Sequence, residues 1–301
     1  MNEHRMAKPG VAVPRKLAER ARQISDGQLS PAVPRDAATV ILLRQAASGV
    51  EAFLLRRTAE LEFAPGAYVF PGGSVDARDA DETIGWAGPA PADFGGLLGV
   101  PPDRARALVC AAVRETFEES GVLLAGPANS SPADLVSDSA ALAADRHALL
   151  TGSASLGDVL GRRGLVLRAD LLTPWARWIT PEASPRRFDT WFFAAALPPG
   201  QTATAAPEGH ADPGESESGT WLGPAVTLEA AQAGQITLLP PTAVTLGELA
   251  GHHDVAGILG RRQVITPRLP KVIVEHGRAR LAMPQAGQER PGDGVSWTEL
   301  E

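Results

Sequence analysis

Apolar positions group into two runs in the first fifth of the chain, AATVILLR at 37–44 and VEAFLLRR at 50–57. The segment QAASG between them supplies a turn, so the pattern predicts a β-hairpin. A third short run, YVF at 68–70, lies between a Pro-Gly turn and a Pro-Gly-Gly stretch. This arrangement predicts another strand that is bounded by turns.

The clearest helical period lies between residues 103 and 120. Asp103 suits the acidic first turn of a helix, and Gly121 suits the position just after its last turn. At about 100° per residue, Val113 and Phe117 fall on one side of this helix and charged residues fall on the other. The pattern therefore predicts an amphipathic helix whose polar face is rich in carboxylates.

Shorter patterns predict further elements along the rest of the chain. The predicted strands lie at 122–125, 175–180, 188–197 and 220–223, the predicted helices at 224–234 and 242–251, and a late hairpin at 272–284. Strands with helices between and after them predict an α/β layered fold.

The division of the chain follows its composition. Residues 1–35 are polar and interrupted by prolines, which predicts an N-terminal arm with one short helix. Residues 36–255 predict one domain with two long insertions, a loop at about 74–101 and glycine-broken helical fragments at about 127–170. Residues 256–301 are expected to form a C-terminal extension that contains the late hairpin.

Composition and charge exclude several classes of protein. A formal net charge of −7 over 301 residues, with no basic patch, argues against a nucleic-acid or anionic-membrane partner. The single cysteine, Cys110, excludes an internal disulfide and a cysteine-based zinc site. Neither a signal-peptide core nor an apolar run of membrane-spanning length is visible, so we expect a cytoplasmic protein.

Three carboxylates, Glu115, Glu118 and Glu119, occupy one arc at the end of the 103–120 helix. A solvated surface helix would show the same acidic face. However, like charges at this spacing repel, and the helix dipole disfavours anions in the last turn. Oxygen ligands that converge on Mg²⁺ or Mn²⁺ would reverse this penalty, and Arg114 could orient one carboxylate.

The run Arg114-Glu-Thr-Phe-Glu-Glu-Ser-Gly-Val122, together with the upstream Phe70-Pro-Gly-Gly73, resembles the signature of the Nudix hydrolases. That signature expects a glutamate where this chain has Asp79, and it expects the arginine 27 residues earlier than Arg114. One branch of this family, which includes the peroxisomal coenzyme A diphosphatases, is similar to this chain in further features. These are the insertion, the Leu-Leu-Arg-Arg run at 54–57 and the segments 187–190 and 239–242.

The resemblance implies a Nudix-type α/β/α sandwich with a mixed sheet and long insertions. It also implies that Glu115, Glu118, Glu119 and the Gly73 carbonyl bind Mg²⁺ or Mn²⁺, with Arg114 as the orienting partner. The metal would polarise a diphosphate, and a carboxylate would take the proton of the attacking water.

Five further residues are weaker candidates. Glu217 precedes a short strand where relatives place an extra acid, as base or as ligand, although a solvated acidic loop is the alternative. Arg57 and Arg187 could hold phosphates by bidentate contacts, or they could be surface charges at strand edges. Phe70 and Gly72 are expected to contact the substrate because they adjoin the proposed metal.

These expectations lead to a metal-dependent diphosphatase whose substrate is a small nucleoside diphosphate derivative, with coenzyme A or an acyl-CoA first. ADP-ribose, a nucleotide sugar or a dinucleotide is the alternative substrate. A non-catalytic Nudix module that senses a nucleotide is the alternative of another class. The sequence leaves the oligomeric state open.

Overall fold

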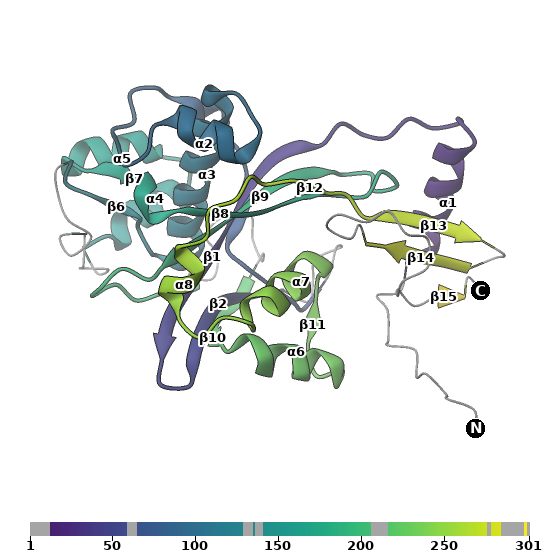
Figure 1. Ribbon diagram of the computed structural model, residues 1–301. Coiled ribbons are helices and arrows are strands. Elements are labelled where there is room, and N and C mark those ends of the chain that lie inside the picture. The colour runs from purple at the N-terminus through teal and green to yellow at the C-terminus, as the bar shows by residue number, and fades with distance from the viewer. Residues whose placement is uncertain are drawn as a thin grey trace. The chain divides into compact units, whose positions relative to one another are not determined.

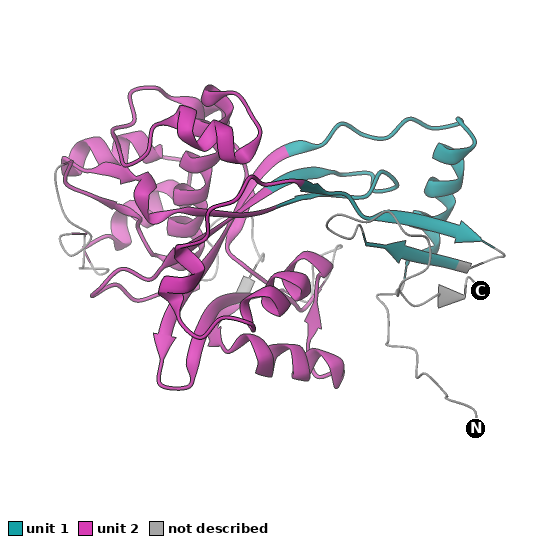
Figure 2. Ribbon diagram, in the orientation of Figure 1, with its two compact units in different colours: residues 1–35, 177–190, 267–301 teal, residues 36–176, 191–266 magenta. Residues whose placement is uncertain are grey.

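The structure is a computed structural model. It describes residues 13–58, 65–128, 135, 141–205, 216–275, 278–283 and 298–299. The chain divides into two compact units (Figure 2). The central unit comprises residues 36–176 and 191–266, and the terminal unit comprises residues 1–35, 177–190 and 267–301.

A mixed β-sheet organises the central unit (Figure 1). Its strands are β1 (Arg35–Ala46), β2 (Gly49–Arg57), β3 (Ala67–Val69), β4 (Gly72–Ser74), β8 (Thr173–Ile179), β9 (Phe188–Ala196), β10 (Ser216–Leu222) and β11 (Thr237–Leu238). Their order is β11-β3-β2-β1-β9-β8, with β10 also paired to β2 and β4 to β1. The β1–β2 hairpin is antiparallel, as the sequence predicts, whereas β11 and β3 run parallel.

The core forms where this sheet meets α3 (Pro102–Ser120). Leu42 of β1 and Phe53 of β2 share one buried cluster with Val109 and Phe117 of α3. Ile41 is as fully buried as its neighbour Leu42, so both faces of β1 are covered. Two helices follow β10 in the chain, and they match the predicted helices. These are α6 (Pro224–Gln232) and α7 (Pro240–Leu249), and α8 (Val255–Leu259) comes next.

The first predicted insertion has more regular structure than its sequence indicates, whereas the two helices of the second lie among its predicted helical fragments. The first contains the 3₁₀ turn η1 (Ala77–Ala80), β5 (Trp86–Ala87) and α2 (Pro91–Leu98); the second contains α4 (Ala143–Leu150), α5 (Leu156–Arg163), β7 (Val166–Arg168) and the 3₁₀ turn η3 (Ala169–Leu171). The prediction of a loop before α3 is therefore wrong for α2, which packs on α3 through Phe94 and Leu98. At eight residues, α2 is too short for its hydrophobic period to be recognised in the sequence, and burial against α3 stabilises it.

The two insertions meet in a second, three-stranded sheet of order β5-β7-β6. The predicted strand at 122–125 is reduced to the two-residue β6 (Ala125–Gly126), because Val122, Leu123 and Leu124 are buried without joining a ladder. Apolar composition alone does not separate a buried strand from a buried irregular segment.

The terminal unit joins both ends of the chain. The predicted arm contains α1 (Arg15–Ser25), which contacts β13 (Lys271–Glu275) of the late hairpin. That hairpin is completed by β14 (Arg278–Ala282), while its predicted turn at 276–277 lies outside the described residues. β15 (Thr298–Glu299) pairs with β14, and β12 (Pro267–Arg268) pairs with the end of β8. Ala18 and Ala279 are buried together in a small core.

Among the described residues, no helix is both long enough and apolar enough to cross a membrane.

Candidate active site

The end of α3 carries the three glutamates of the candidate site, with Glu118 and Glu119 in its last turn and Glu115 one turn earlier. The helix ends at Gly121, whose φ of +72° is a left-handed conformation that favours glycine. No basic residue lies in this last turn. The negative end of the helix dipole therefore adds to the mutual repulsion of Glu115, Glu118 and Glu119.

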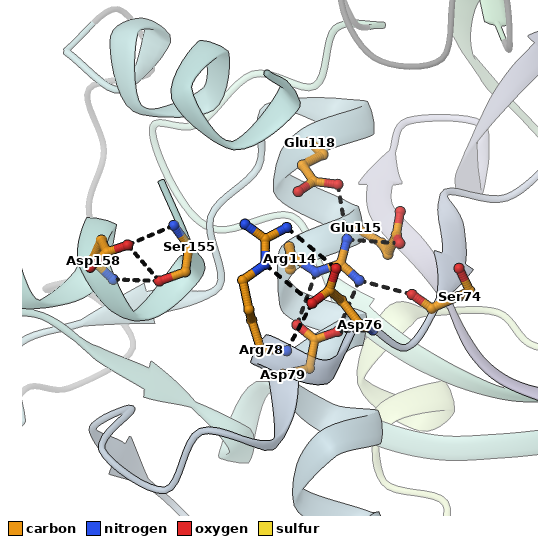
Figure 3. Close-up of polar contacts among 9 residues, drawn as sticks. All are labelled: Ser74, Asp76, Arg78, Asp79, Arg114, Glu115, Glu118, Ser155 and Asp158. Atoms are coloured by element: carbon orange, nitrogen blue, oxygen red, sulfur yellow. Dashed lines mark hydrogen bonds and ion pairs between the residues drawn. The ribbon is translucent and has the colours of Figure 1, made fainter. Parts of the chain in front are cut away.

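Arg114 uses all five of its N–H donors on neighbouring groups (Figure 3). Its Nε and Nη2 donate to the two carboxylate oxygens of Asp79, each at 2.9 Å. Its Nη1 donates to Glu115 Oε1 at 2.8 Å and to Glu118 Oε2 at 3.0 Å, while Nη2 also donates to the Ser74 carbonyl at 2.9 Å. Since the side chain is 90% removed from solvent, this network fixes two of the glutamates.

Asp79 ties the two separated halves of the motif together across 35 residues. Its carboxylate also accepts a hydrogen bond from the Asp76 backbone N–H at 2.8 Å, which closes a capping box on η1. Only 1% of Asp79 is exposed, so the Arg114 pair is buried on both sides. In the sequence, Asp79 is visible only as a departure from the motif, so it is not among the predicted site residues.

Gly72 and Gly73 bring the backbone of β4 against the glutamates. The Gly72 N–H donates to Glu119 Oε2 at 2.7 Å. A Cβ atom at Gly73 would lie 2.5 Å from Glu115 Oε1, and a Cβ atom at Gly72 would lie 2.6 Å from Thr39 Cα of β1. Both positions therefore need glycine for close approach, one to a carboxylate and the other to the sheet.

Burial and charge set the ionisation of this cluster. Burial raises the pKa of Glu115 to about 7. The positive charge of Arg114 opposes this shift, and the negative charge of Glu118 adds to it. Burial also raises the pKa of Glu118 above its ordinary value, with Arg114 again opposing the shift. Burial disfavours the charge of Arg114, yet the Asp79 hydrogen bond and the surrounding carboxylates outweigh it and raise the pKa of Arg114. A further cation would best neutralise the mutual repulsion of the carboxylates in this cluster.

A family model described as the NUDT19 Nudix domain matches residues 94–249, just over half of the 301-residue chain. The chain belongs to the NUDT19 Nudix domain family. A crystal structure of a NUDIX hydrolase from Alicyclobacillus acidocaldarius has a TM-score of 0.60 and 26% identity, and the match covers 77% of this chain and 98% of that chain. The resemblance and the Nudix-type α/β fold expected from the sequence are thus confirmed.

Two curated relatives of this Nudix protein carry the same name, acyl-coenzyme A diphosphatase NUDT19. The Homo sapiens protein is 31% identical over 252 residues, covering 70% of this chain and 64% of the relative. The Gallus gallus protein is 30% identical over 228 residues, covering 64% of this chain and 58% of the relative. The chain thus spans about three fifths of the length of these relatives.

The donor set at the end of α3 suits a hard divalent cation, because carboxylate and backbone oxygens are its preferred ligands. The cradle at Gly73, which a Cβ atom would fill, leaves that backbone beside Glu115. In the described part of the chain, no three His, Cys, Asp or Glu side chains are already grouped as metal ligands. Glu115 and Glu118 instead face Arg114, while Glu119 faces the Gly72 N–H.

The remaining candidates lie in different surroundings. Phe70 is buried and packs edge-on against Phe192, with ring centroids 6.5 Å apart, which is an ordinary core contact. Arg57 ends β2, and its buried Nε has no hydrogen-bond partner among the described residues. Arg187 belongs to the terminal unit.

Arg187 donates from Nε to the Thr180 carbonyl at 3.0 Å and from Nη1 to the Ala32 carbonyl at 2.8 Å. These contacts favour a structural role for a buried side chain. Glu217 lies in β10, where the register against β2 shifts between Ser216 and Ser218. A bulge of this kind re-aims a side chain near many active sites, but the side chain of Glu217 itself lies outside the described residues.

Proposed function

We propose that this chain is a metal-dependent Nudix diphosphatase that cleaves coenzyme A or an acyl-CoA between its two phosphates. The observation that carries the proposal is the buried Arg114 network, which gathers Glu115, Glu118 and the β4 backbone around one place in the fold. The network joins like charges at a cost to stability, and such an arrangement is typical of a functional site.

Under this proposal, Glu115, Glu118, Glu119 and the Gly73 carbonyl hold Mg²⁺ or Mn²⁺. When bound, the metal neutralises the diphosphate and polarises its phosphoryl oxygens. Arg114 keeps Glu115 and Glu118 in fixed rotamers through its paired donors. Glu217 is the proposed base that takes a proton from the attacking water, and Arg57 is a proposed phosphate contact.

The substrate class follows from two separate supports. Curated relatives at about 30% identity are named acyl-coenzyme A diphosphatases. The 54–73 run also resembles the coenzyme A-type opening of the motif. Cleavage would give adenosine 3′,5′-bisphosphate and a phosphopantetheine product. Contacts to the remote pantetheine arm would raise turnover at phosphorus as well as affinity.

The test compares coenzyme A, an acyl-CoA and ADP-ribose with Mg²⁺, with Mn²⁺ and without metal, with products separated by chromatography. We expect metal-dependent release of adenosine 3′,5′-bisphosphate, and a kcat/KM for coenzyme A at least about tenfold above that for ADP-ribose. Hydrolysis of ADP-ribose with coenzyme A untouched would reject the substrate but keep the diphosphatase. Binding of any of the three without cleavage would reject the enzyme in favour of a sensing module.

A further inference from the structure

A buried arginine from the second insertion lies at the end of the acidic helix. Arg146 belongs to α4, which packs against α3 (Figure 1). Only 8% of Arg146 is exposed, and the negative charge of Glu119 favours its ionised form. Burial disfavours the charge of this side chain, so a neutral side chain of similar size would fill the same space at a lower cost in stability.

Two of its nitrogens donate to backbone carbonyls, and the third donates to a hydroxyl. Arg146 Nε donates to the Glu118 carbonyl at 2.9 Å, and Nη2 donates to the Thr204 carbonyl at 2.9 Å. Nη1 approaches Thr204 Oγ1 at 3.3 Å. The guanidinium therefore joins the last turn of α3 to the segment 201–205.

The neighbouring contacts make this junction specific. The Thr204 N–H donates to the Ser120 carbonyl at 2.9 Å, so two carbonyls at the end of α3 are capped from the same place. A Cβ atom at Gly121 would lie 2.9 Å from Arg146 Nη1, so glycine there serves the helix end and the arginine together. Gln201 adds two hydrogen bonds to the backbone of Leu123, at 2.8 and 2.9 Å.

We propose that Arg146 is a positioning residue for the glutamates at the end of α3. By binding the Glu118 carbonyl and Thr204, it orders the last turn and fixes where Glu118 and Glu119 point. Its positive charge also opposes the negative end of the helix dipole, which three carboxylates aggravate. The inference rests on the proposed function in so far as those glutamates are metal ligands.

The experiment compares Arg146→Met with Arg162→Met. Arg162 lies on α5 of the same insertion, pairs with Asp145 and, among the contacts of the described residues, makes no hydrogen bond to α3. Mn²⁺ affinity is measured by calorimetric titration, and amide hydrogen exchange of residues 117–122 is measured without metal. We expect Arg146→Met to weaken Mn²⁺ binding by about tenfold or more and to speed exchange in this segment. Arg162→Met should change neither.

A double-mutant cycle tests whether the effect passes through the glutamates. In a Glu118→Gln background, Arg146→Met should weaken Mn²⁺ binding by a clearly smaller factor than in the wild type. An equal factor in both backgrounds would overturn the proposed route. Unchanged Mn²⁺ affinity and exchange in folded Arg146→Met would overturn the proposal itself and leave Arg146 as a packing residue.

Arg146→Lys covers the case in which the methionine variant does not fold. Lysine keeps the buried charge but cannot bridge the two carbonyls with a planar fork, so we expect intermediate Mn²⁺ affinity and intermediate exchange. Wild-type behaviour of the lysine variant would contradict a role for the fork. If the wild-type chain binds no Mn²⁺, the proposed function fails, whereas the metal-free exchange data still decide whether Arg146 orders the helix end.

Discussion

Two helices of the central unit place their charges in opposite ways, and Figure 3 shows both. α5 begins with a capping box in which Ser155 Oγ accepts from the Asp158 N–H at 3.1 Å and the Asp158 carboxylate accepts from the Ser155 N–H at 2.8 Å. Its last turn carries Arg162 and Arg163. Acids at the start and bases at the end both interact favourably with the helix dipole.

α3 reverses this order at its end, where Glu115, Glu118 and Glu119 lie and no basic residue is present in the last turn. The compensation comes from outside that turn, through the side chains of Arg114 and Arg146 and the Gly72 N–H. The difference teaches that α5 is arranged for local stability, whereas α3 tolerates local repulsion in order to gather carboxylates. The following predictions test this contrast from the largest expected effect to the smallest.

The largest effect is expected from Arg114→Met. The substitution leaves Asp79, which is 1% exposed, without its buried partner, and it frees Glu115 and Glu118 to repel each other. We expect the free energy of unfolding to fall by about 3–5 kcal/mol in urea titrations. Arg162→Met on α5 is the matched control, with an expected change within about 0.5 kcal/mol because Arg162 is exposed and its partner Asp145 keeps an ion pair with Arg163. Equal losses in the two variants would show that the Arg114 network is no more than surface charge pairing.

Glu118→Gln should separate function from stability. Glutamine can still accept the hydrogen bond from Arg114 Nη1, which is 3.0 Å long in the wild type, but it removes one negative charge. We expect turnover on coenzyme A to fall at least about 100-fold, or about 2.7 kcal/mol, at saturating Mg²⁺. Stability should stay within about 0.5 kcal/mol and could rise from relieved repulsion. Asp158→Asn on α5 is the control and should keep full turnover; unchanged turnover in Glu118→Gln would return Glu118 to a solvated helix face.

The pH dependence of stability should expose the repulsion in α3. The pKa of Glu115 is about 7 in the folded chain and has its ordinary value of 4.5 in the unfolded chain. Between pH 4.5 and 7, the folded chain therefore keeps a proton that the unfolded chain has lost. Stability of the metal-free protein should therefore fall as the pH rises through this window, by roughly 1–3 kcal/mol. Glu115→Gln should flatten the slope in thermal unfolding, and added Mg²⁺ should do the same by favouring the ionised carboxylate. A slope that persists in Glu115→Gln would assign it to another group.

The smallest effect is expected on α5. Ser155→Ala removes the hydroxyl that accepts from the Asp158 N–H at 3.1 Å, which should cost about 1 kcal/mol of stability. Turnover and Mn²⁺ affinity should not change, because the residue serves only its own helix. Loss of activity without loss of stability would mean that α5 takes part in the site, and the contrast with α3 would then fail.

Local patterns in the sequence predict the elements whose signals are contained within one segment. The β1–β2 hairpin follows from two apolar runs around a short turn, and α3 follows from its period and its glycine end. These predictions succeed because alternation, periodicity and capping act over a few residues. The loop prediction for 74–101 fails at α2, which depends on packing against α3 rather than on its own period.

The sequence by itself determined which residues are the candidates for the chemistry: the three glutamates, Arg114 and the glycines of the split motif. Only the tertiary structure decided what surrounds them, namely that Asp79 pairs with Arg114 across 35 residues and that Arg146 caps α3. In the terminal unit, the tertiary structure also decided that Arg187 donates hydrogen bonds to backbone carbonyls and that α1 contacts β13. The physical reason is that these contacts join segments far apart in the chain, so neither spacing nor period encodes them, and the burial that selects them exists only after folding.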